Sequence, residues 1–274
     1  MHLPSSRRRR ARPLLGTLVD ITLDEADVQR AHDAFDAAFA AIAKVHALMS
    51  VHDPLSELSA LVRTAHRHPV RVHADTACVL RLAQAMHTAS AGIFDVAAHT
   101  GAGGSSADIR IDADDCVRFE RALQIDLGGI AKGHAVDRAI EALRTRGITS
   151  ALVNAGGDMR CFGTTAYPVH LRFAGGVRTV AMLQGSALAA SSHAHRAVET
   201  PQAERASPAD AHIDARNGRV MQRRDTIVVQ APSAAVADAL TKVAIVCSTN
   251  ADKACRAMQA QWRSFDYFDT QLAA

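Results

Sequence analysis

The sequence predicts an α+β fold, in which helices and mainly antiparallel strands share one core. Two observations support this class. Segments with helical and strand periodicity interleave along the chain, and they do so without a regular strand–helix–strand repeat. The chain has 274 residues, of which 48% are hydrophobic, and this is ample for a large core. Aromatic residues make up only 4%, so we expect that core to consist mainly of small and branched aliphatic side chains.

The first half of the chain predicts one strand and three helices. Residues 14–23 have a strand pattern, and apolar residues recur at helical spacing between Val28 and Met49. A short helix is predicted at residues 56–62, after the break at Pro54, and a longer amphipathic helix at residues 75–90. Residues 98–106 are rich in glycine, which predicts a flexible segment.

The second half predicts two helices among several strands. Residues 133–143 have a helical pattern that ends at Gly147, and residues 151–153 predict a buried strand. Residues 168–188 alternate like antiparallel strands, and residues 199–210 predict a surface loop. After a strand at residues 226–230, Ser233 is a candidate N-cap for a helix over residues 234–246. Residues 254–268 carry mixed helix and strand signals.

We expect one domain over residues 14–274, preceded by a disordered basic tail over residues 1–13. The tail contains a block of arginines (Arg7, Arg8, Arg9, Arg10 and Arg12) that accounts for the net charge of +3. Blocks of like charge are commonly solvated tails. Since no basic face with interleaved aromatics occurs elsewhere, the sequence argues against a nucleic-acid partner.

Cysteine usage and hydropathy indicate an intracellular protein without a membrane span. The five cysteines are scattered, with neither a CxxC pair nor zinc-site spacing. No segment approaches the roughly 18 consecutive apolar residues that a membrane span needs. Because the N-terminus also lacks a clear signal peptide and a lipid-attachment cysteine, we expect a cytoplasmic location.

Two glycine turns carry the strongest functional signal. The sequence from Asp126 to Gly133, DLGGIAKG, opens a predicted helix, and AGGD, residues 155–158, closes a predicted strand. Glycine lets a ligand approach the backbone, and a helix N-terminus offers free N–H groups to a phosphate. Lys132 adds a full positive charge, so the pattern predicts a site for a phosphorylated ligand. An ordinary strand-to-helix turn is the competing interpretation, and Lys132 would then be a solvated lysine.

The order and spacing of further motifs resemble the ApbE family, whose members are FAD:protein FMN transferases. The matching segments extend over nearly the whole chain, in this order: LGTLV at residue 15, MSVHDPLSELS at 49, GIFD at 92, DLGGIAKG at 126, NAGGD at 154, ALAAS at 187, HIDARNGR at 212 and APS…ADAL at 231. General nucleotide-loop, metalloprotease and serine-hydrolase motifs do not occur.

This resemblance implies a T-fold-like α+β fold that binds FAD as a substrate near Mg²⁺. The implied reaction is attack by a threonine hydroxyl of an acceptor protein on the FMN phosphorus of FAD, with release of AMP. The resemblance makes His212 a candidate base and Asp238 both a catalytic residue and a metal ligand, together with the carbonyl of Ala131. The implied flavin contacts are His52, Glu57, Asp95, Gly128, Gly129, Lys132, Asp158 and Ser191.

Several of these residues also have simpler interpretations. Asp238 could serve the dipole of its own helix, Asp158 could cap its turn, and Glu57 could be only a helix-start carboxylate. A histidine such as His212 taken at random, among 14 in the chain, would more often lie at the surface.

Three departures from the family pattern concern the metal and the flavin ring. The family usually has a threonine four residues after the metal-binding aspartate, and here that residue is Lys242, with Thr241 directed away from that helix face. An ammonium there can take the metal's place, although a one-residue helix shift or a lysine that reaches solvent would explain the residue equally well. His52 replaces a tyrosine that stacks on the flavin, which predicts weaker stacking. The loop after Asp95 and residues 191–196 lack the family's aromatics.

These departures leave two alternative functions beside the transferase. One is an FAD-binding protein that does not transfer flavin, and the other is an FAD pyrophosphatase in which water replaces the threonine. His212, Asp238 and the intact glycine turns favour the transferase, whereas Lys242 and His52 favour the alternatives.

Overall fold

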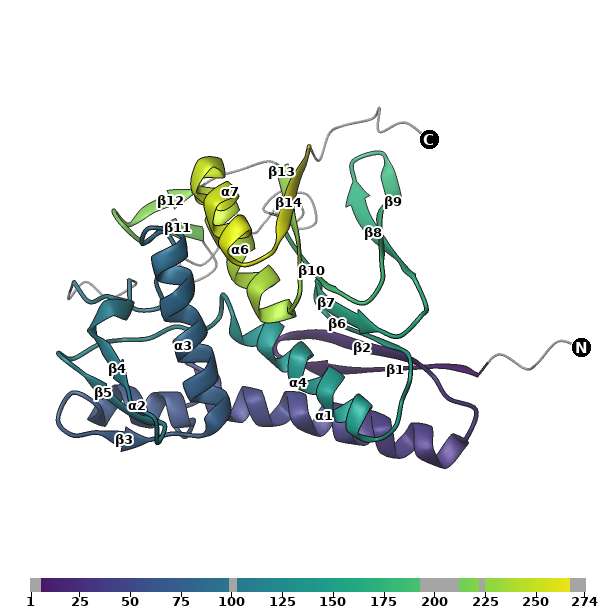
Figure 1. Cartoon of the computed structure of the whole chain (residues 1–274), viewed down its shortest axis with the longest axis horizontal. Helices are drawn as coiled ribbons and strands as arrows, with labels where there is room; N and C mark the ends of the chain where they lie inside the picture. Colours follow the sequence, from purple (N-terminus) through teal and green to yellow (C-terminus); the bar gives the residue numbers. More distant parts are fainter. Residues whose placement is uncertain (1–5, 99–102, 193–211, 222–224, 267–274) are drawn as a thin grey trace, which may run out of the picture.

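The computed structural model describes residues 6–98, 103–192, 212–221 and 225–266. A seven-stranded sheet organises the molecule, with strand order β1-β2-β6-β7-β10-β13-β14 and antiparallel pairing between all neighbours (Figure 1). Its strands are β1 (Arg7–Leu14), β2 (Thr17–Asp24), β6 (Ala151–Ala155), β7 (Asp158–Phe162), β10 (Ala187–Ser192), β13 (Asp225–Ala231) and β14 (Gln261–Asp266). The predicted α+β class is confirmed.

Helices cover one face of this sheet. They are α1 (Val28–Met49), α4 (Ala131–Thr145) and α6 (Ala234–Val246), and α7 (Ser248–Ala257) packs beside α6. Alternate residues of the strands, among them Val19, Val153 and Val229, face these helices and form the main core. The other face is covered by a hairpin of β8 (Tyr167–Phe173) and β9 (Gly176–Leu183), which builds a second, smaller core around Tyr167 and Leu188.

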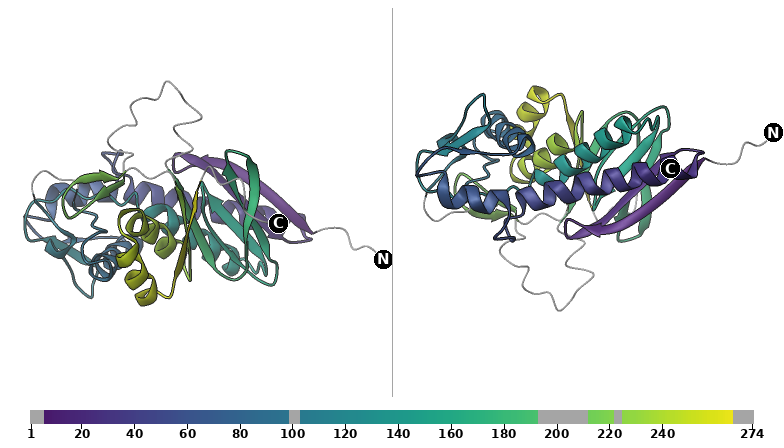
Figure 2. Two further views of the ribbon diagram at one scale, coloured as in Figure 1. Left: turned by 90° about the horizontal axis from the view of Figure 1, so that it is seen from above. Right: turned by 90° about the horizontal axis from the view of Figure 1, so that it is seen from below.

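A smaller lobe follows α1, which runs from the β1 end of the sheet to that lobe (Figures 1 and 2). It contains α2 (Glu57–Thr64), α3 (Ala74–Ala89), the single turn η1 (Ser106–Asp108) and a small sheet of order β3-β5-β4. The strands of this sheet are β3 (Val70–Arg71), β4 (Ile109–Ile111) and β5 (Cys116–Phe119). A separate short hairpin pairs β11 (His212–Asp214) with β12 (Arg219–Met221).

Most helix predictions are confirmed to within two residues at each end. The helix from Val28 to Met49 has the predicted ends, and Ser233 caps α6 by accepting the N–H of Val236. The helix predicted at residues 133–143 begins two residues earlier, at Ala131, so Lys132 lies in its first turn. The mixed signals after residue 254 resolve into the end of α7 and strand β14. The loop predicted at residues 199–210 lies outside the described residues.

The prediction of a disordered tail over residues 1–13 was wrong for residues 7–13. These residues form β1, which pairs with β2 across a tight turn at Leu15 and Gly16, both with positive φ. The arginines are not simply solvated, because each has a partner within the fold. Arg9 pairs with Asp20 across the hairpin, and the guanidinium of Arg12 lies 4.5 Å from the ring centroid of Phe39 in α1. None of the described helices has both the length and the apolar character that crossing a bilayer requires.

Candidate functional site

The two glycine turns meet at the start of α4. The first turn leads directly into this helix, and the second joins β6 to β7. Lys132 in the first turn of α4 donates from its Nζ to Oδ2 of Asp158 over 2.6 Å, and the same Nζ lies 3.5 Å from Oδ2 of Asp238 in α6. A single ammonium therefore links a helix N-terminus, the second glycine turn and a neighbouring helix.

Asp238 is the buried centre of this group, and its side chain has no exposed surface. Its Oδ1 is 2.5 Å from the Nζ of Lys242, one helical turn later, and its Oδ2 accepts the backbone N–H of Gly133 over 3.2 Å. Four charged side chains thus meet here, and we call them the lysine–carboxylate cluster: Lys132, Asp158, Asp238 and Lys242. The interpretation of Asp238 as only a helix-dipole residue does not fit these contacts.

Glycine is needed where α4 meets α6. A Cβ on Gly133 would lie 2.2 Å from the carbonyl oxygen of Ala234, which is closer than any two such atoms can approach. At Gly129, a Cβ would lie 3.6 Å from Cγ of Lys242 and 3.3 Å from the ring of Phe94. The aliphatic stem of Lys242 therefore packs along the glycine turn, and the lysine does not extend into solvent.

Burial and charge pairing within the cluster shift the pKa values of Lys132, Asp158 and Asp238. Burial alone would lower the pKa of Lys132, but Asp238 and Asp158 outweigh it, so this pKa lies above its ordinary value. Burial and the neighbouring Asp238 raise the pKa of Asp158. Burial would also raise the pKa of Asp238, but the two lysines outweigh burial there, and the pKa of Asp238 is lowered. The two lysines therefore stabilise the charged form of Asp238, whereas burial disfavours the charged form of Asp158.

A second pair of predicted site residues, Ser191 and His212, involves β10, the strand that pairs with β7. Oγ of Ser191, at the end of β10, is 3.0 Å from Nε2 of His212 at the start of β11. Ala189 pairs directly with Asp158 on β7, and Ser191 follows two positions later on the same face of β10. The serine–histidine pair and the lysine–carboxylate cluster are therefore neighbours across two adjacent strands.

Asp95 has a clear structural role, because it organises the loop that follows it. Its Oδ1 accepts the backbone N–H of Ala97 and both the N–H and the hydroxyl of Ser106, and its Oδ2 accepts the hydroxyl of Ser105. His87 of α3 completes the group, with its Nδ1 3.0 Å from Oδ2. Burial would raise the pKa of Asp95, but these hydrogen bonds outweigh it and lower that pKa well below its ordinary value.

Glu57 and His52 lie away from the cluster. Glu57 joins two helices, since its carboxylate accepts the N–H of His73 and the hydroxyl of Thr76 at the start of α3. His52 is exposed, and it lines a hollow of about 310 Å³ beside Pro54, Leu58 and Ile125. Gly128 is exposed as well, and its N–H donates to Oδ1 of Asp126 within the first glycine turn. The structure brings none of these three residues into hydrogen-bond or ion-pair contact with Asp238.

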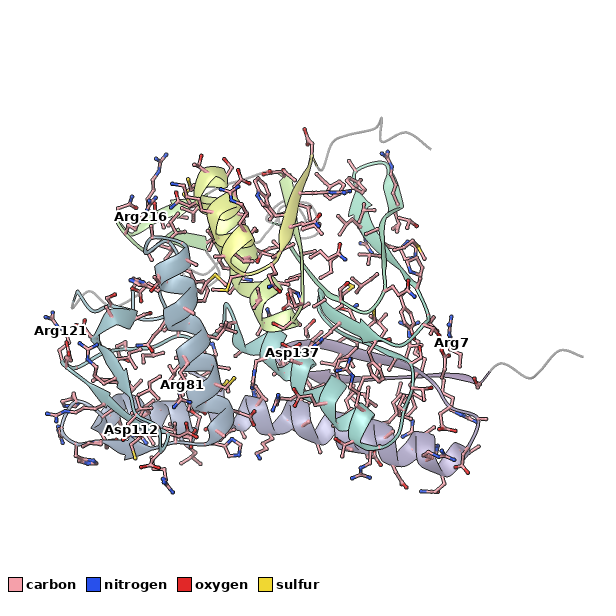
Figure 3. The ribbon with its side chains drawn as sticks, in the orientation of Figure 1. Arg7, Arg81, Asp112, Arg121, Asp137 and Arg216 are labelled. Atoms are coloured by element: carbon pink, nitrogen blue, oxygen red, sulfur yellow. The ribbon has the colours of Figure 1, made fainter. Side chains whose placement is uncertain are left out.

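No sequence motif indicated Asp137, although this residue orients both helices of the site. Its carboxylate lies between α4 and the start of α6, as Figure 3 shows, and it accepts the N–H groups of Ala234 and Ala235 over 2.9 and 3.0 Å. Arg160 of β7 pairs with the same carboxylate. Asp137 lies four residues after Gly133, so both are on one helix face, but the partner of Asp137, Ala234, is 97 residues away in sequence.

The residues around Asp238 do not fit a divalent cation. Magnesium takes about six oxygen ligands, and it needs a carboxylate oxygen that is open to it. Oδ1 of Asp238 faces an ammonium instead, and the hydroxyl of Thr241 donates to the carbonyl of Asp238 and lies 3.1 Å from the Nζ of Lys242. Within the described part of the chain, no three His, Cys, Asp or Glu side chains are grouped to hold a metal ion.

Comparison with known proteins identifies the family to which this chain belongs. A model of the ApbE family matches residues 15–102 and 97–263, which together span most of the chain. A protein of Klebsiella pneumoniae (strain 342) named FAD:protein FMN transferase is 27% identical over 150 residues. The match covers 46% of this chain, and it spans about half (48%) of the length of that relative. The chain belongs to the ApbE family.

Solved structures of the family have the same fold. The flavin transferase ApbE of Vibrio cholerae superposes with a TM-score of 0.78 at 20% identity, covering 97% of this chain and 95% of that one. The apo form of the flavinyl transferase ApbE of Pseudomonas stutzeri gives a TM-score of 0.79 at 15% identity, with coverages of 96% and 92%. At these identities the likeness establishes the fold alone, and it confirms the ApbE-type α+β architecture expected from the motifs.

Proposed function

We propose that this protein transfers FMN from FAD to a hydroxyl side chain, a threonine, of an acceptor protein. Membership of the ApbE family supports the flavin substrate, and the name of the Klebsiella pneumoniae relative supports the reaction. The observation that carries the proposal is the junction of the two glycine turns through Lys132 at the N-terminus of α4. A pyrophosphate needs this combination of backbone N–H groups, a helix dipole and a fixed cation.

In the proposed reaction one bond forms and another breaks at the FMN phosphorus. The acceptor hydroxyl oxygen forms a bond to that phosphorus, the bond to the AMP phosphate breaks, and AMP leaves with the bridging oxygen. The hydroxyl proton goes to the imidazole of His212, and Ser191, whose Oγ lies 3.0 Å from Nε2, orients that ring. Lys132 stabilises the charge that develops on the pyrophosphate as the leaving AMP separates.

The flavin end of FAD is assigned to the approach side of the first glycine turn. The hollow beside His52, between the start of α2 and the segment that leads into the turn, offers apolar walls from Pro54, Leu58 and Ile125. Because imidazole covers less of a flavin ring than a larger aromatic side chain does, we expect His52 to contribute only modestly to binding.

An acceptor-labelling experiment tests this function. The protein is incubated with FAD and an acceptor domain that carries a flavinylatable threonine, and the acceptor is examined for flavin fluorescence in a denaturing gel. We expect a fluorescent acceptor band and equimolar AMP, and no band when the acceptor threonine is changed to valine. His212→Gln should reduce labelling about 100-fold or more, as loss of a general base commonly does. His170→Gln is the matched control, because His170 is exposed on β8.

Two other outcomes would replace the proposal with the alternatives that Lys242 favours. AMP release without a labelled acceptor would make the protein an FAD pyrophosphatase. Retention of FAD without either product would make it a flavin-binding protein that does not transfer. The contact of Lys242 with Asp238 is the specific observation behind both alternatives, because an ammonium carries half the charge of a divalent cation.

A further inference from the structure

We propose that Lys132 and Lys242 together bind the FAD pyrophosphate in place of a divalent cation, so that flavin binding by this protein does not depend on metal. The proposal rests on the proposed function, since it takes FAD to be the ligand. It departs from the magnesium requirement that the family resemblance implied, and it follows from the contacts of this chain's own residues.

The first argument is the position of the Lys242 ammonium. Asp238 and Lys242 are four residues apart on α6, so both side chains lie on the same helix face. Nζ of Lys242 lies against Oδ1 of Asp238, the carboxylate oxygen that a metal ion would need. A cation that approached this oxygen would have to displace the ammonium, and the displaced lysine would lose its only acidic partner among the described residues.

The second argument is that the lysine is built into the site. Its Cγ and Cε lie 3.6 and 3.7 Å from the place of a Cβ on Gly129, so the stem runs along the first glycine turn. Its Nζ also lies 3.1 Å from the hydroxyl of Thr241. Packing along the stem and two polar contacts at the head hold Lys242 in one position, and 24% of its side chain remains exposed for a ligand.

The third argument comes from how this chain uses cations. Only four of its 31 basic residues are lysines, and two of those four meet at Asp238. An ammonium is a compact point charge with three donors, whereas a guanidinium is a wide planar group. A compact charge fits the position that a metal ion would occupy beside the phosphates. A lysine there can therefore donate to phosphate oxygens from the same place.

Charge accounting gives the consequence for the ligand. The two ammonium groups cancel the two carboxylates of Asp158 and Asp238, so the helix dipole of α4 and the partly exposed lysine heads provide the attraction for the pyrophosphate. A divalent ion in place of Lys242 would leave one net positive charge. We therefore expect this site to bind FAD less tightly than a site with a divalent ion would, and with an affinity that does not change when magnesium is added.

FAD binding measured with and without metal tests the inference. Equilibrium dialysis of FAD against the folded protein, in EDTA and in excess MgCl₂, should give the same Kd within about twofold, since no charge at the site changes. Lys242→Thr should make FAD binding depend on magnesium. Lys242→Met should weaken FAD binding about tenfold or more in both buffers, because one charge-assisted contact is lost. Lys253→Met, an exposed lysine on α7, is the matched control and should bind like the unchanged protein.

Direct metal binding provides an independent readout. Mn²⁺ titrated into the FAD complex and followed by electron paramagnetic resonance should remain free with the unchanged protein and become bound with Lys242→Thr. Circular dichroism establishes that each variant is folded before it is compared.

Four results would overturn either the metal-independence of binding or the proposed function. Magnesium that tightens FAD binding of the unchanged protein, or Mn²⁺ bound beside FAD, would disprove the lysine substitution and leave the flavin function intact. A folded Lys242→Thr variant that is indifferent to magnesium would also disprove it. Absence of FAD binding in both buffers would disprove the proposed function itself.

Discussion

Lys132 is the single residue on which the site depends most. It contacts two buried carboxylates from the first turn of α4, and their charges keep its ammonium protonated. No other described side chain touches both the second glycine turn and α6 in this way. Its role in binding FAD and its role in neutralising Asp158 are separable, and a pair of variants separates them.

Lys132→Met should weaken FAD binding about tenfold or more and should also lower the melting temperature, because Asp158 loses its cation. Adding Asp158→Asn removes the stranded carboxylate, so the double variant should regain stability but not FAD affinity. Thermal denaturation and equilibrium dialysis measure the two effects. If the double variant recovers both properties, Lys132 is a structural residue and does not bind the ligand.

The ion pair of His87 with Asp95 makes part of the stability depend on pH. The hydrogen bond to Asp95 raises the pKa of His87 above its ordinary value of 6.5. Its stabilising contribution is therefore complete below that ordinary value and fades as the pH rises through the raised pKa. Asp95, with its lowered pKa, contributes fully above its ordinary value of 3.8, so the pair is strongest between these two values.

His87→Asn should consequently lower the melting temperature more at pH 6 than at pH 9. We expect a difference of about 2 °C, since a partly exposed pair contributes at most about 1 kcal/mol. Differential scanning calorimetry at both values measures it, and His170→Asn provides an exposed histidine for comparison. An equal loss at both pH values would contradict a charged pair.

At the scale of elements, the contact between α4 and α6 positions the cluster. Gly133 lets the helices approach, and Asp137 accepts two N–H groups at the start of α6. Asp238 and Lys132 meet only because these two helices are this close. The helix contact is therefore the structural basis of the site.

Gly133→Ala should separate the helices. Its Cβ would lie 2.2 Å from a backbone oxygen that cannot rotate away, and overpacking of this kind costs about 1–3 kcal/mol or more. Urea denaturation measures the loss, and FAD binding should weaken with it. Gly175→Ala is the control, because the nearest atom to its Cβ is the flexible end of Arg178 at 3.5 Å. Unchanged stability of Gly133→Ala would contradict the close packing described here.

The limits of sequence-based prediction also appear at this scale. Helix ends were predictable because caps and periodicity are local, as at Ser233. The roles of Asp137, Glu57 and Asp95 were not predictable, because most of their partners lie 8 to 98 residues away in sequence. The motifs located Lys132, Asp158 and Asp238, but only the fold could show that Lys242 turns inward and that Thr241 lies beside its ammonium.

At the scale of the whole molecule, the arginine-rich N-terminus is part of the folded sheet. Local composition suggested a solvated tail. It could not show the acidic and aromatic partners of the arginines, because these come from β2 and α1. Arg10 and Arg12 lie over Phe35 and Phe39, and so they close the outer side of the core at the edge of the sheet.

Arg10→Ala combined with Arg12→Ala should destabilise the protein by about 1–2 kcal/mol, because it removes two cation–π contacts and the exposed ion pairs of both arginines with Asp36. Guanidinium denaturation measures this change. Arg118→Ala, an exposed arginine on β5, is the control and should stay within about 0.5 kcal/mol of the unchanged protein. A loss no larger than that of the control would mean that the strand adds nothing to stability.

The central claim is that the FAD pyrophosphate binds at the start of α4, between Lys132 and Lys242. A crystal structure of the protein grown with FAD in the presence of EDTA tests it most directly. We predict pyrophosphate oxygens within hydrogen-bond distance of both lysine Nζ atoms and of backbone N–H groups at the first glycine turn. A pyrophosphate bound elsewhere, or FAD that appears only when magnesium is added and coordinates Asp238, would contradict the account.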